Sequence, residues 1–274
     1  MINNYTKNLE LNEIGIYTTQ QNIDISYPVD GNNRCFEIED NSFWFEHRNK
    51  VILAVIKKYI EGNVFIDIGG GNGYVSSFLQ NNGINTILLE PGQQGALNAK
   101  KRGLENVICS TLEDVKFVKE TVPNIGLFDV IEHIEDDIKF LNKVNEILLP
   151  NGRLFITIPA LKFLWSENDT RAGHFRRYTL KSIKDTLQAA NFKINYSTYF
   201  FSMLPLPIFI KRTLPSLINI NSKDKYQQSK QEHSEKSGLI AKCLNSFANK
   251  EIRKIDNCEI INIGSSIVVV ATKN

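Results

Sequence analysis

The segment that constrains the fold most is an apolar run that ends in an acid and then turns through closely spaced glycines. Residues 64–68 read as a buried strand with Asp67 near its end, and Gly69, Gly71 and Gly73 follow at alternate positions. Glycine adopts positive φ without steric cost and lets a ligand approach the backbone. The next residues read as a helix, whose first N–H groups are free to bind an anionic or polar group. This segment predicts a strand–loop–helix unit with a ligand on the glycines.

Two common nucleotide-binding patterns do not fit this loop. A dinucleotide fingerprint, G-x-G-x-x-G, would place its last glycine at Tyr74, and no Gly-Lys-Ser/Thr follows to make a P-loop. The remaining pattern is D-x-G-x-G-x-G. A second apolar strand, 86–89, ends in Glu90. An acid about 20 residues past such glycines accepts ribose hydroxyls in nucleotide-binding α/β folds, the alternative being that Glu90 only ends a strand.

Strands and helices alternate from residue 64 to residue 158, which predicts a parallel sheet with right-handed crossovers. Two late strands flank a helical insertion and fit an antiparallel pair that closes the sheet. The expected strands are residues 64–68, 86–89, 106–109, 125–130, 153–158, 192–199 and 266–271. The expected helices are residues 42–60, 74–82, 92–102, 112–119, 137–149, 179–190 and 239–256.

The ends of the chain differ from this alternating core. Residues 1–42 are polar and rich in asparagine, and we expect a loosely structured extension. We therefore divide the chain into residues 1–50, an extension with the start of a lid helix, and residues 51–274, the main domain. This domain carries a lid insertion at about residues 200–238.

Composition narrows the class of protein. The 274 residues are 42% hydrophobic and 23% charged with a net charge of +2, which fits a globular protein and argues against a nucleic-acid partner. The four cysteines show no C-x-x-C spacing, so we expect reduced thiols and no zinc knuckle. No apolar region follows Met1, so we expect no signal peptide and a cytoplasmic location.

The segment after the fourth strand holds the first candidate catalytic group, in the pattern D-x-x-E-H. Asp129, Glu132 and His133 follow a strand end, where ligands bind in open α/β sheets. Polar groups inside an apolar segment are costly without partners or a function. A neutral imidazole at His133 can deprotonate a hydroxyl nucleophile. The alternatives are that Glu132 caps a helix and that His133 is a satisfied core histidine.

A second polar cluster follows the fifth strand. His174 is a candidate second base or orienting group, with packing beneath the lid as the alternative. Arg176 and Arg177 can hold an anionic acceptor such as a phosphate or carboxylate, or form a solvated pair. Trp44 and Trp165 are expected to pack rather than stack on a substrate.

An apolar, proline-broken segment, residues 199–220, reads as a lid over the site or as an interfacial membrane contact, with a helical cover as the alternative. It is too short to span a bilayer. We expect Pro205 and Pro207 to prevent a continuous helix, and residues 222–237 to be the most mobile part of the chain.

The glycine loop resembles that of class I S-adenosylmethionine (SAM) dependent methyltransferases. The resemblance implies a Rossmann-like α/β fold: a seven-stranded, mostly parallel sheet with an antiparallel last strand and helices on both faces. Thr111 stands where the family often has an aspartate, so adenine contacts shift to Glu113 or to the backbone. The residues that it implies for the cofactor are Asp67, Gly69, Gly71, Gly73, Glu90, Thr111, Leu112, Glu113 and Phe128.

The D-x-x-E-H stretch is similar to the E-x-x-E-H of ubiquinone-biosynthesis O-methyltransferases, where it is associated with a divalent metal. This likeness makes Asp129, Glu132 and His133 candidate Mg²⁺ ligands as well as catalytic residues, together with His174. The joint pattern also resembles methyltransferases of bacterial polysaccharide and lipid pathways. It implies O-methylation of a small-molecule, sugar-linked or lipid-linked acceptor. The alternatives are a non-catalytic SAM-binding regulator and an RNA methyltransferase.

Overall fold

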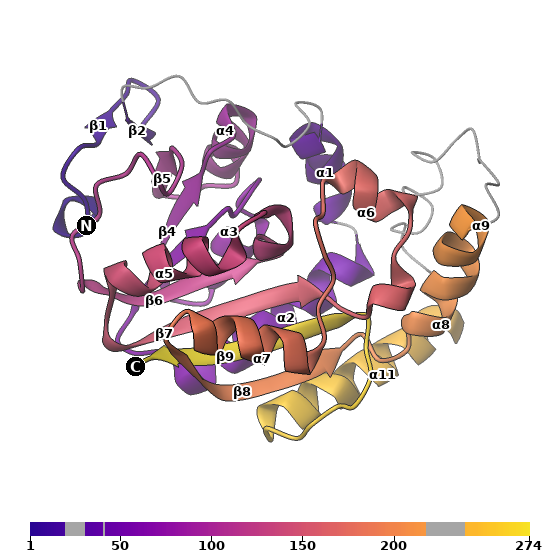
Figure 1. The fold of residues 1–274 in the computed structure, drawn as a ribbon. Coiled ribbons are helices and arrows are strands. Elements are labelled where there is room, and N and C mark those ends of the chain that lie inside the picture. Colours follow the sequence, from indigo (N-terminus) through magenta and orange to yellow (C-terminus); the bar gives the residue numbers. More distant parts are fainter. Residues whose placement is uncertain (20–30, 41, 218–238) are drawn as a thin grey trace.

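The computed structural model describes residues 1–19, 31–40, 42–217 and 239–274. Within these ranges the chain forms one sheet of nine strands in the order β1-β2-β5-β4-β3-β6-β7-β9-β8 (Figure 1). The strands are β1 (Glu10–Leu11), β2 (Tyr17–Thr18), β3 (Val64–Ile68), β4 (Asn85–Glu90), β5 (Asn106–Cys109), β6 (Val122–Phe128), β7 (Leu148–Pro159), β8 (Phe192–Phe200) and β9 (Ser266–Lys273).

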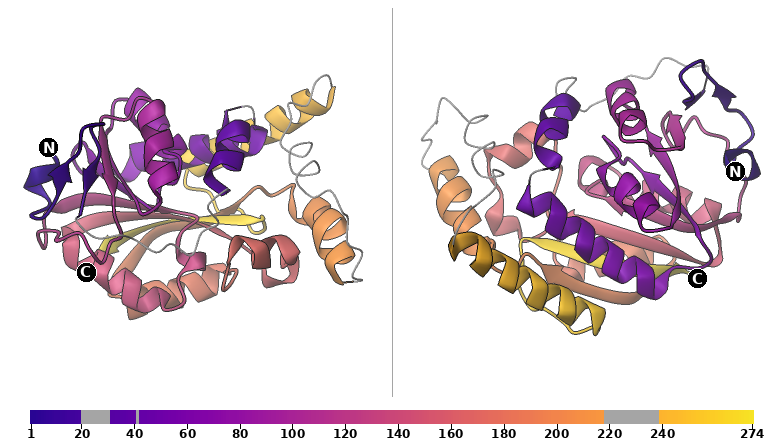
Figure 2. Two further views of the ribbon diagram at one scale, coloured as in Figure 1. Left: turned by 90° about the horizontal axis from the view of Figure 1, so that it is seen from above. Right: turned by 180° about the vertical axis from the view of Figure 1, so that it is seen from behind.

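Helices cover both faces of this sheet. The longer helices are α2 (Phe43–Tyr59), α3 (Tyr74–Asn81), α4 (Gln93–Lys101), α5 (Asp137–Ile147), α7 (Leu180–Ala189) and α11 (Leu239–Asp256). Figure 2 shows α2, α3, α4 and α11 on one face and α5 and α7 on the other. The shorter helices α1 (Gly31–Glu39), α6 (Glu167–Ala172), α8 (Pro205–Ile208) and α9 (Leu214–Leu217) lie beyond the carboxyl ends of the parallel strands, and both termini lie at the opposite end (Figure 1).

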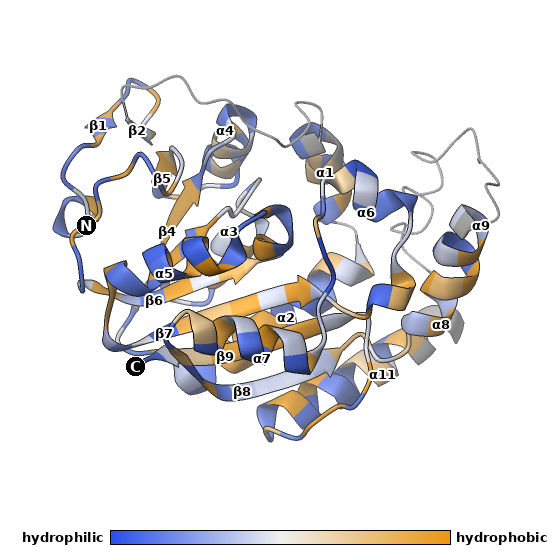
Figure 3. Cartoon of the chain, in the orientation of Figure 1, coloured by the Kyte–Doolittle hydropathy of each residue, from blue (hydrophilic) through white to orange (hydrophobic). Residues whose placement is uncertain are grey.

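The predicted core of seven strands is confirmed. Strands β3 to β7 are mutually parallel, and β9 is antiparallel to both β7 and β8. Strands covered on both faces read as continuous apolar runs, and residues 267–271 at the centre of β9 are all buried. Figure 3 shows this hydrophobic band along the strands. The class is the α/β fold that the sequence implied, with a parallel sheet that brings the strand ends to one edge.

Two strands beyond the predicted seven come from the N-terminal region. Tyr17 and Thr18 of β2 pair in parallel with Ile108 and Cys109 of β5, and Ile2 is only 1% exposed. The expectation of a loosely structured extension is therefore wrong for residues 1–19. Polar composition hid these contacts because only a few apolar side chains are buried there.

The helix expected at residues 112–119 is absent, and the chain forms turns there. Thr111 Oγ1 donates a hydrogen bond to Asp114 Oδ2 over 2.6 Å, and Asp114 N–H donates to Thr111 Oγ1 over 3.2 Å. Such local side-chain bonds compete with helix formation. Phe117 then forms an isolated antiparallel bridge with Thr6, which uses the backbone groups that a helix would need.

The lid segment is helical from Pro205 to Leu217. It comprises α8, a π-helical turn (η4, Phe209–Thr213) and α9. Pro205 and Pro207 lie in the first turn, where a missing N–H costs no helical hydrogen bond, so the expectation that they prevent a continuous helix is wrong. The π-turn precedes Pro215, whose ring excludes the regular bond to the carbonyl four residues back. Residues 222–237, expected to be mobile, lie outside the described residues.

A buried contact between a histidine and a carboxylate joins α2 to α11, two helices that cover the sheet. His47 Nε2 of α2 lies 2.6 Å from Glu251 Oε2 of α11, and both side chains are almost fully buried. The same carboxylate accepts hydrogen bonds from the N–H groups of Phe201 (2.8 Å) and Ser202 (2.9 Å). Hydrogen bonds from His47 and the Ser202 backbone overcome the effect of burial and lower the pKa of Glu251. Glu251 thus fixes the point where β8 turns into the lid.

Candidate functional site

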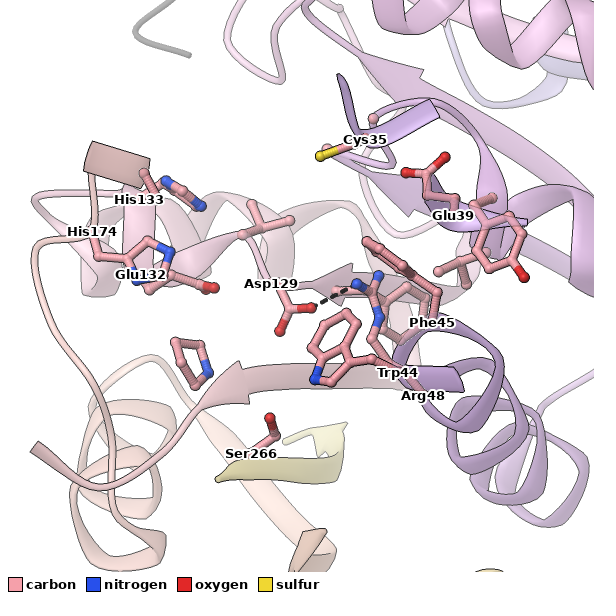
Figure 4. A pocket seen from close by; sticks show the side chains of 18 of the residues that line it. Cys35, Glu39, Trp44, Phe45, Arg48, Asp129, Glu132, His133, His174 and Ser266 are labelled. Atoms are coloured by element: carbon pink, nitrogen blue, oxygen red, sulfur yellow. Dashed lines mark ion pairs between the residues drawn. The ribbon is translucent and has the colours of Figure 1, made fainter. Parts of the chain in front are cut away.

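A cavity of about 1220 Å³ opens at the carboxyl ends of the parallel strands. Its wall combines the glycine loop after β3, the segment after β6, the α1 and α2 helices, the residues after α6, and the lid. Figure 4 shows Cys35 and Glu39 on one side of the cavity and the two imidazoles of His133 and His174 on the other, with Asp129 between them. The site is therefore built from several segments, most of which are distant from one another in the sequence.

One end of the cavity is formed by the glycine loop and Glu90. The N–H group of Gly71 donates a 2.8 Å hydrogen bond to Glu90 Oε2, and that of Gly92 donates a 2.8 Å hydrogen bond to Glu90 Oε1. Burial raises the pKa of Glu90 to about 7 in spite of these two donors. Gly71 has a φ of +55°, and a Cβ placed there would meet nothing within 4 Å. A ligand can thus lie against this backbone beside the carboxylate.

Gly95 on α4 is a part of this end that the sequence reading missed. A Cβ at Gly95 would lie 2.9 Å from Glu90 Cγ and 2.9 Å from the Gly71 carbonyl oxygen. The absence of a side chain therefore lets α4 pack directly against the loop. The signal was a glycine inside a helical pattern, which usually marks close packing.

Asp67 lies under the loop and is fully buried. Ser76 donates a 2.7 Å hydrogen bond to Asp67 Oδ2, whereas Asp67 Oδ1 has no hydrogen-bond partner. Burial raises the pKa of Asp67 to about 6, and the Ser76 bond and the Arg48 charge oppose this effect. A buried carboxylate oxygen without a donor is costly, and it can accept a donor from a ligand.

Helix α1 closes over the glycine loop through Asn72. The Asn72 side-chain amide donates to the carbonyl of Asn32 (2.8 Å) and to Glu39 Oε1 (3.2 Å). Glu39 Oε2 also pairs with Arg102 at 2.9 Å, and burial raises the pKa of Glu39. These contacts make α1 a wall of the cavity.

Asp129 is paired with Arg48 rather than placed with the histidines. Its Oδ2 lies 2.8 Å from Arg48 Nη1, and its backbone has a φ of +57° at the end of β6 (Figure 4). The Arg48 guanidinium lies over Trp44, 5.3 Å from the ring centroid. Arg48 also lowers the pKa values of Asp67 and Glu132 against the larger effect of burial. Arg48 is thus one of the cations that line this cavity and balance its acidic groups.

Glu132, His133 and His174 form the other end of the cavity. One ligand atom of each lies within 4.8 Å of the others, and the two imidazole rings meet edge to face at 4.7 Å. Burial and the Asp129 charge raise the pKa of Glu132 well above its usual range. Burial and the His174 imidazole lower the pKa of His133 to about 4. His133 is therefore neutral at physiological pH.

This cluster is not the predicted metal set. In the structure His174, and not Asp129, lies with Glu132 and His133. The three ligands are therefore two imidazole nitrogens and one carboxylate, a set that suits zinc or iron. Mg²⁺ prefers oxygen ligands in octahedral geometry. The described residues thus do not fit the expected magnesium ion.

Asp169 of α6 is the functional candidate that the sequence reading missed. Its Oδ1 lies 3.0 Å from His174 Nδ1, and Arg177 contacts its two carboxylate oxygens at 2.7 and 3.1 Å. Burial raises the pKa of Asp169, but the bonds from His174 and Arg177 outweigh burial and hold it below its usual range. Asp169 therefore remains charged and orients the imidazole. Its spacing of five residues from His174 gave no recognised motif.

Comparison with known proteins decides the family. The profile of a family described as "Methyltransferase domain" matches residues 44–197, more than half of the chain. The chain belongs to the class I SAM-dependent methyltransferase family. The matched region contains the glycine loop, Glu90 and the Glu132–His133 pair.

Curated methyltransferases share shorter stretches with the chain. The "Ubiquinone biosynthesis O-methyltransferase" of Parvibaculum lavamentivorans is 30% identical over 97 residues, which are 34% of this chain and 38% of that relative. A "Probable S-adenosylmethionine-dependent methyltransferase" of Mycolicibacterium smegmatis is 20% identical over 170 residues, covering 61% of this chain and 66% of the relative. The first alignment thus spans little more than a third of the relative's length.

Solved structures confirm the methyltransferase fold. A Thermotoga maritima SAM-dependent methyltransferase, titled a possible histamine N-methyltransferase, has a TM-score of 0.57 at 18% identity and covers 90% of this chain and 96% of its own. Haemonchus contortus phosphoethanolamine N-methyltransferase 2, solved with SAM, has a TM-score of 0.56 at 16% identity. It covers 94% of this chain and 61% of its own. At these identities the likeness shows the fold alone.

The remaining predicted residues fall into two groups. Phe128 lines the cavity, as do Gly69 and Trp44. Gly73 does not line the cavity and has the positive φ of a tight turn before α3. The predicted adenine loop also lies outside the lining: Thr111, Leu112 and Glu113. Arg176 pairs with Asp137 at 2.7 Å, and Arg177 pairs with Asp169. Neither of these two arginines is therefore free to bind an anionic acceptor.

Proposed function

We propose that this methyltransferase transfers the methyl group of SAM to an oxygen of a small-molecule acceptor, sugar-linked and lipid-linked acceptors included. The observation that carries the proposal is the single cavity that joins Glu90 and the glycine loop to the His133–His174 pair. A volume of about 1220 Å³ exceeds the range of roughly 300–1,000 Å³ for one ligand. It has room for a cofactor and an acceptor together.

The residues at the loop end fit SAM. Glu90 can accept the two ribose hydroxyls, and the open space at Gly71 admits the ligand against the backbone. The buried Asp67 Oδ1, which has no hydrogen-bond partner, can accept a donor from the charged amino-acid end of the cofactor. When bound, SAM supplies an electrophilic methyl group, and its sulfur takes the bonding electrons as the acceptor oxygen bonds to the methyl carbon.

We assign the general base to His174, with Asp169 as its orienting partner. The Asp169 carboxylate accepts from His174 Nδ1, which leaves Nε2 to take the acceptor's hydroxyl proton. The charge of Asp169 then stabilises the imidazolium that forms. His133 supports this role less well, since a base with a pKa of about 4 is poorly matched to neutral pH. Its neutral imidazole is suited to orient the acceptor hydroxyl by a hydrogen bond.

The walls between the two ends exclude water from the reacting atoms. Trp44 stacks on Phe201 with ring centroids 5.3 Å apart, and Leu204 and Ile208 of the lid segment also line the cavity. A dry, apolar wall strengthens electrostatic contacts and favours the alignment of the nucleophile. It also favours an acceptor with an apolar part.

A transfer assay tests the proposal. The full chain would be incubated with methyl-labelled SAM and a panel of catechols, sugar nucleotides and polyprenyl intermediates. The masses of the products would then be measured by mass spectrometry. We expect one added methyl group on oxygen with at least one class, and loss of it in His174→Ala. SAM binding without transfer to any class would instead support a non-catalytic regulator, and methylated RNA would support the RNA alternative.

A further inference from the structure

The lid has a second face, which points away from the cavity. Its inner side, including Leu204, Ile208 and Arg212, lines the cavity. On the other side Leu206, Ile210 and Leu214 recur at every fourth position and are 67%, 54% and 43% exposed. This spacing places the three side chains in one stripe along a helical segment. The segment therefore presents apolar side chains to the solvent, whereas its inner side combines apolar and cationic side chains.

A neighbouring segment adds an exposed aromatic side chain that contacts the same helical segment. Phe163 of η3 (Lys162–Leu164) is 55% exposed, and its ring lies 6.3 Å from that of Phe209. We call the surface formed by Phe163, Leu206, Ile210 and Leu214 the outer apolar face. Figure 3 shows hydrophobic residues along α8 and α9, at the edge of the molecule.

The segment that carries the outer apolar face is anchored to its neighbours by hydrogen bonds. Thr213 Oγ1 donates to the carbonyl of Leu164 over 3.1 Å, and Glu167 N–H donates to Ser216 Oγ over 3.1 Å. Thr213 is 2% exposed, so the segment is anchored by its inner side. Exposed apolar side chains grouped on an anchored element mark an interaction surface.

The charge around this face selects its partner. Residues 201–217 contain no acidic residue, and the segment carries Lys211 and Arg212. Lys162 and Lys211 are exposed beside the apolar side chains. The nearby acid Glu167 is paired with Arg171 at 2.6 Å. Apolar side chains flanked by cations fit the interface of a membrane with anionic lipids, because the chains enter the acyl boundary and the cations meet the headgroups.

We propose that the outer apolar face binds the surface of an anionic lipid bilayer. None of the described helices is long and apolar enough to cross a bilayer. Binding would place the cavity mouth next to the lipid surface, because Lys211 belongs both to the cavity lining and to the exposed cationic flank. An acceptor with a lipid part could then enter the site from the bilayer. The surface stands on exposure and charge, and does not depend on the proposed reaction.

Vesicle flotation of the full chain tests this surface. We expect binding to phosphatidylcholine vesicles that contain phosphatidylglycerol, and little binding to phosphatidylcholine alone. Leu206→Gln/Ile210→Gln should reduce the partition coefficient about tenfold or more. The matched control is Leu11→Gln/Ile14→Gln, which changes two apolar residues that are 58% and 57% exposed at β1 and the turn that follows it. The control should bind vesicles as the wild type does, and both variants should retain SAM affinity.

Three results would overturn the proposal. The first is no binding to either vesicle, or equal binding to both. The second is an equal loss of vesicle binding in the outer-face variant and in the control. The third is a wild-type dimer in analytical ultracentrifugation that Leu206→Gln/Ile210→Gln converts to monomers, which would assign the face to a second copy of the chain. Binding to anionic vesicles should also weaken in about 1 M salt, where the screening length falls to about 3 Å.

Discussion

His174 Nδ1 lies 3.0 Å from Oδ1 of Asp169, a carboxylate that is only 2% exposed and that Arg177 holds by two nitrogens. The contact fixes the orientation of the imidazole and directs its other nitrogen away from Asp169. The same relationship occurs wherever a carboxylate orients a histidine base. It gives the proposed mechanism its most specific test.

His174→Ala should lower kcat about 10²–10⁴-fold and leave SAM affinity unchanged, because a general base contributes on this scale. Asp169→Asn should lower kcat by less and shift the pH–rate profile, since the neutral amide no longer stabilises an imidazolium. Steady-state kinetics and calorimetric SAM titrations measure both effects. Glu167→Gln on the same helix α6 is the control and should retain kcat. If His174→Ala keeps full kcat, the base is another residue.

Removal of metal ions should leave the methyl transfer intact. The proposed base needs no metal, and the Glu132–His133–His174 cluster does not match the preference of Mg²⁺ for oxygen. The check is the initial rate after dialysis against EDTA, with and without added Mg²⁺ or Zn²⁺. A rate abolished by EDTA and restored by Zn²⁺ would make the cluster a metal centre and contradict the assignment of His174.

Glu90 should couple stability to pH in the cofactor-free protein. Burial raises its pKa from 4.5 to about 7, so between these values the folded chain binds more protons than the unfolded chain. The free energy of unfolding therefore falls as pH rises through this window, by about 3 kcal/mol for this group. Urea titrations from pH 4.5 to 8 would measure this dependence.

In Glu90→Gln that contribution should be missing from the pH dependence. The variant should also bind SAM more weakly, because an amide cannot accept both ribose hydroxyls. The difference between wild type and variant isolates Glu90 from Asp67, Glu132 and His133, whose pKa values are also displaced. If the free energy of unfolding changed with pH in the same way in both proteins, Glu90 would not be the group that binds the proton.

Glu251→Ala should destabilise the fold by about 3–5 kcal/mol, because it leaves His47 without its partner and removes the acceptor of two backbone N–H groups at the start of the lid. Chemical denaturation measures the change. Asp256→Ala, an exposed acid on the same helix α11, should change stability by less than about 0.5 kcal/mol. Equal effects of the two substitutions on stability would show that the contact between His47 and Glu251 does not stabilise the fold more than an exposed acid does.

The sequence predicted the central fold well because its signals were local. Strand β3 matches the expected residues 64–68, and Gly69, Gly71 and Gly73 all have the positive φ that the loop pattern predicts. Apolar runs bounded by glycine and proline define such strands without knowledge of their neighbours. The antiparallel last strand then followed from the resemblance to the methyltransferase family.

The features that the sequence did not predict depend on contacts that no local pattern or motif indicates. Asp169 reaches His174 only through the turn after α6, and Asp129 leaves the predicted metal set because Arg48, far earlier in the chain, pairs with it. The turns at residues 112–119 likewise depend on Thr6. Propensity and spacing carry no information on such partners, whereas topology alone correctly placed Glu132 and His133 at the sheet edge.

SAM binding by a glycine-loop variant tests the central claim most directly. Gly71→Val adds a side chain where a Cβ meets open space in the cavity, and Gly83→Val makes the same change at a φ of +82°, also into open space but outside the cavity lining. Both variants bear the strain of about 1–2 kcal/mol for a left-handed residue, so they are matched in stability. We predict that calorimetry shows micromolar SAM binding in wild type and Gly83→Val, and none in Gly71→Val, with native far-UV circular dichroism throughout. Unchanged SAM binding in Gly71→Val, or NADH bound in place of SAM by the wild type, would contradict the account.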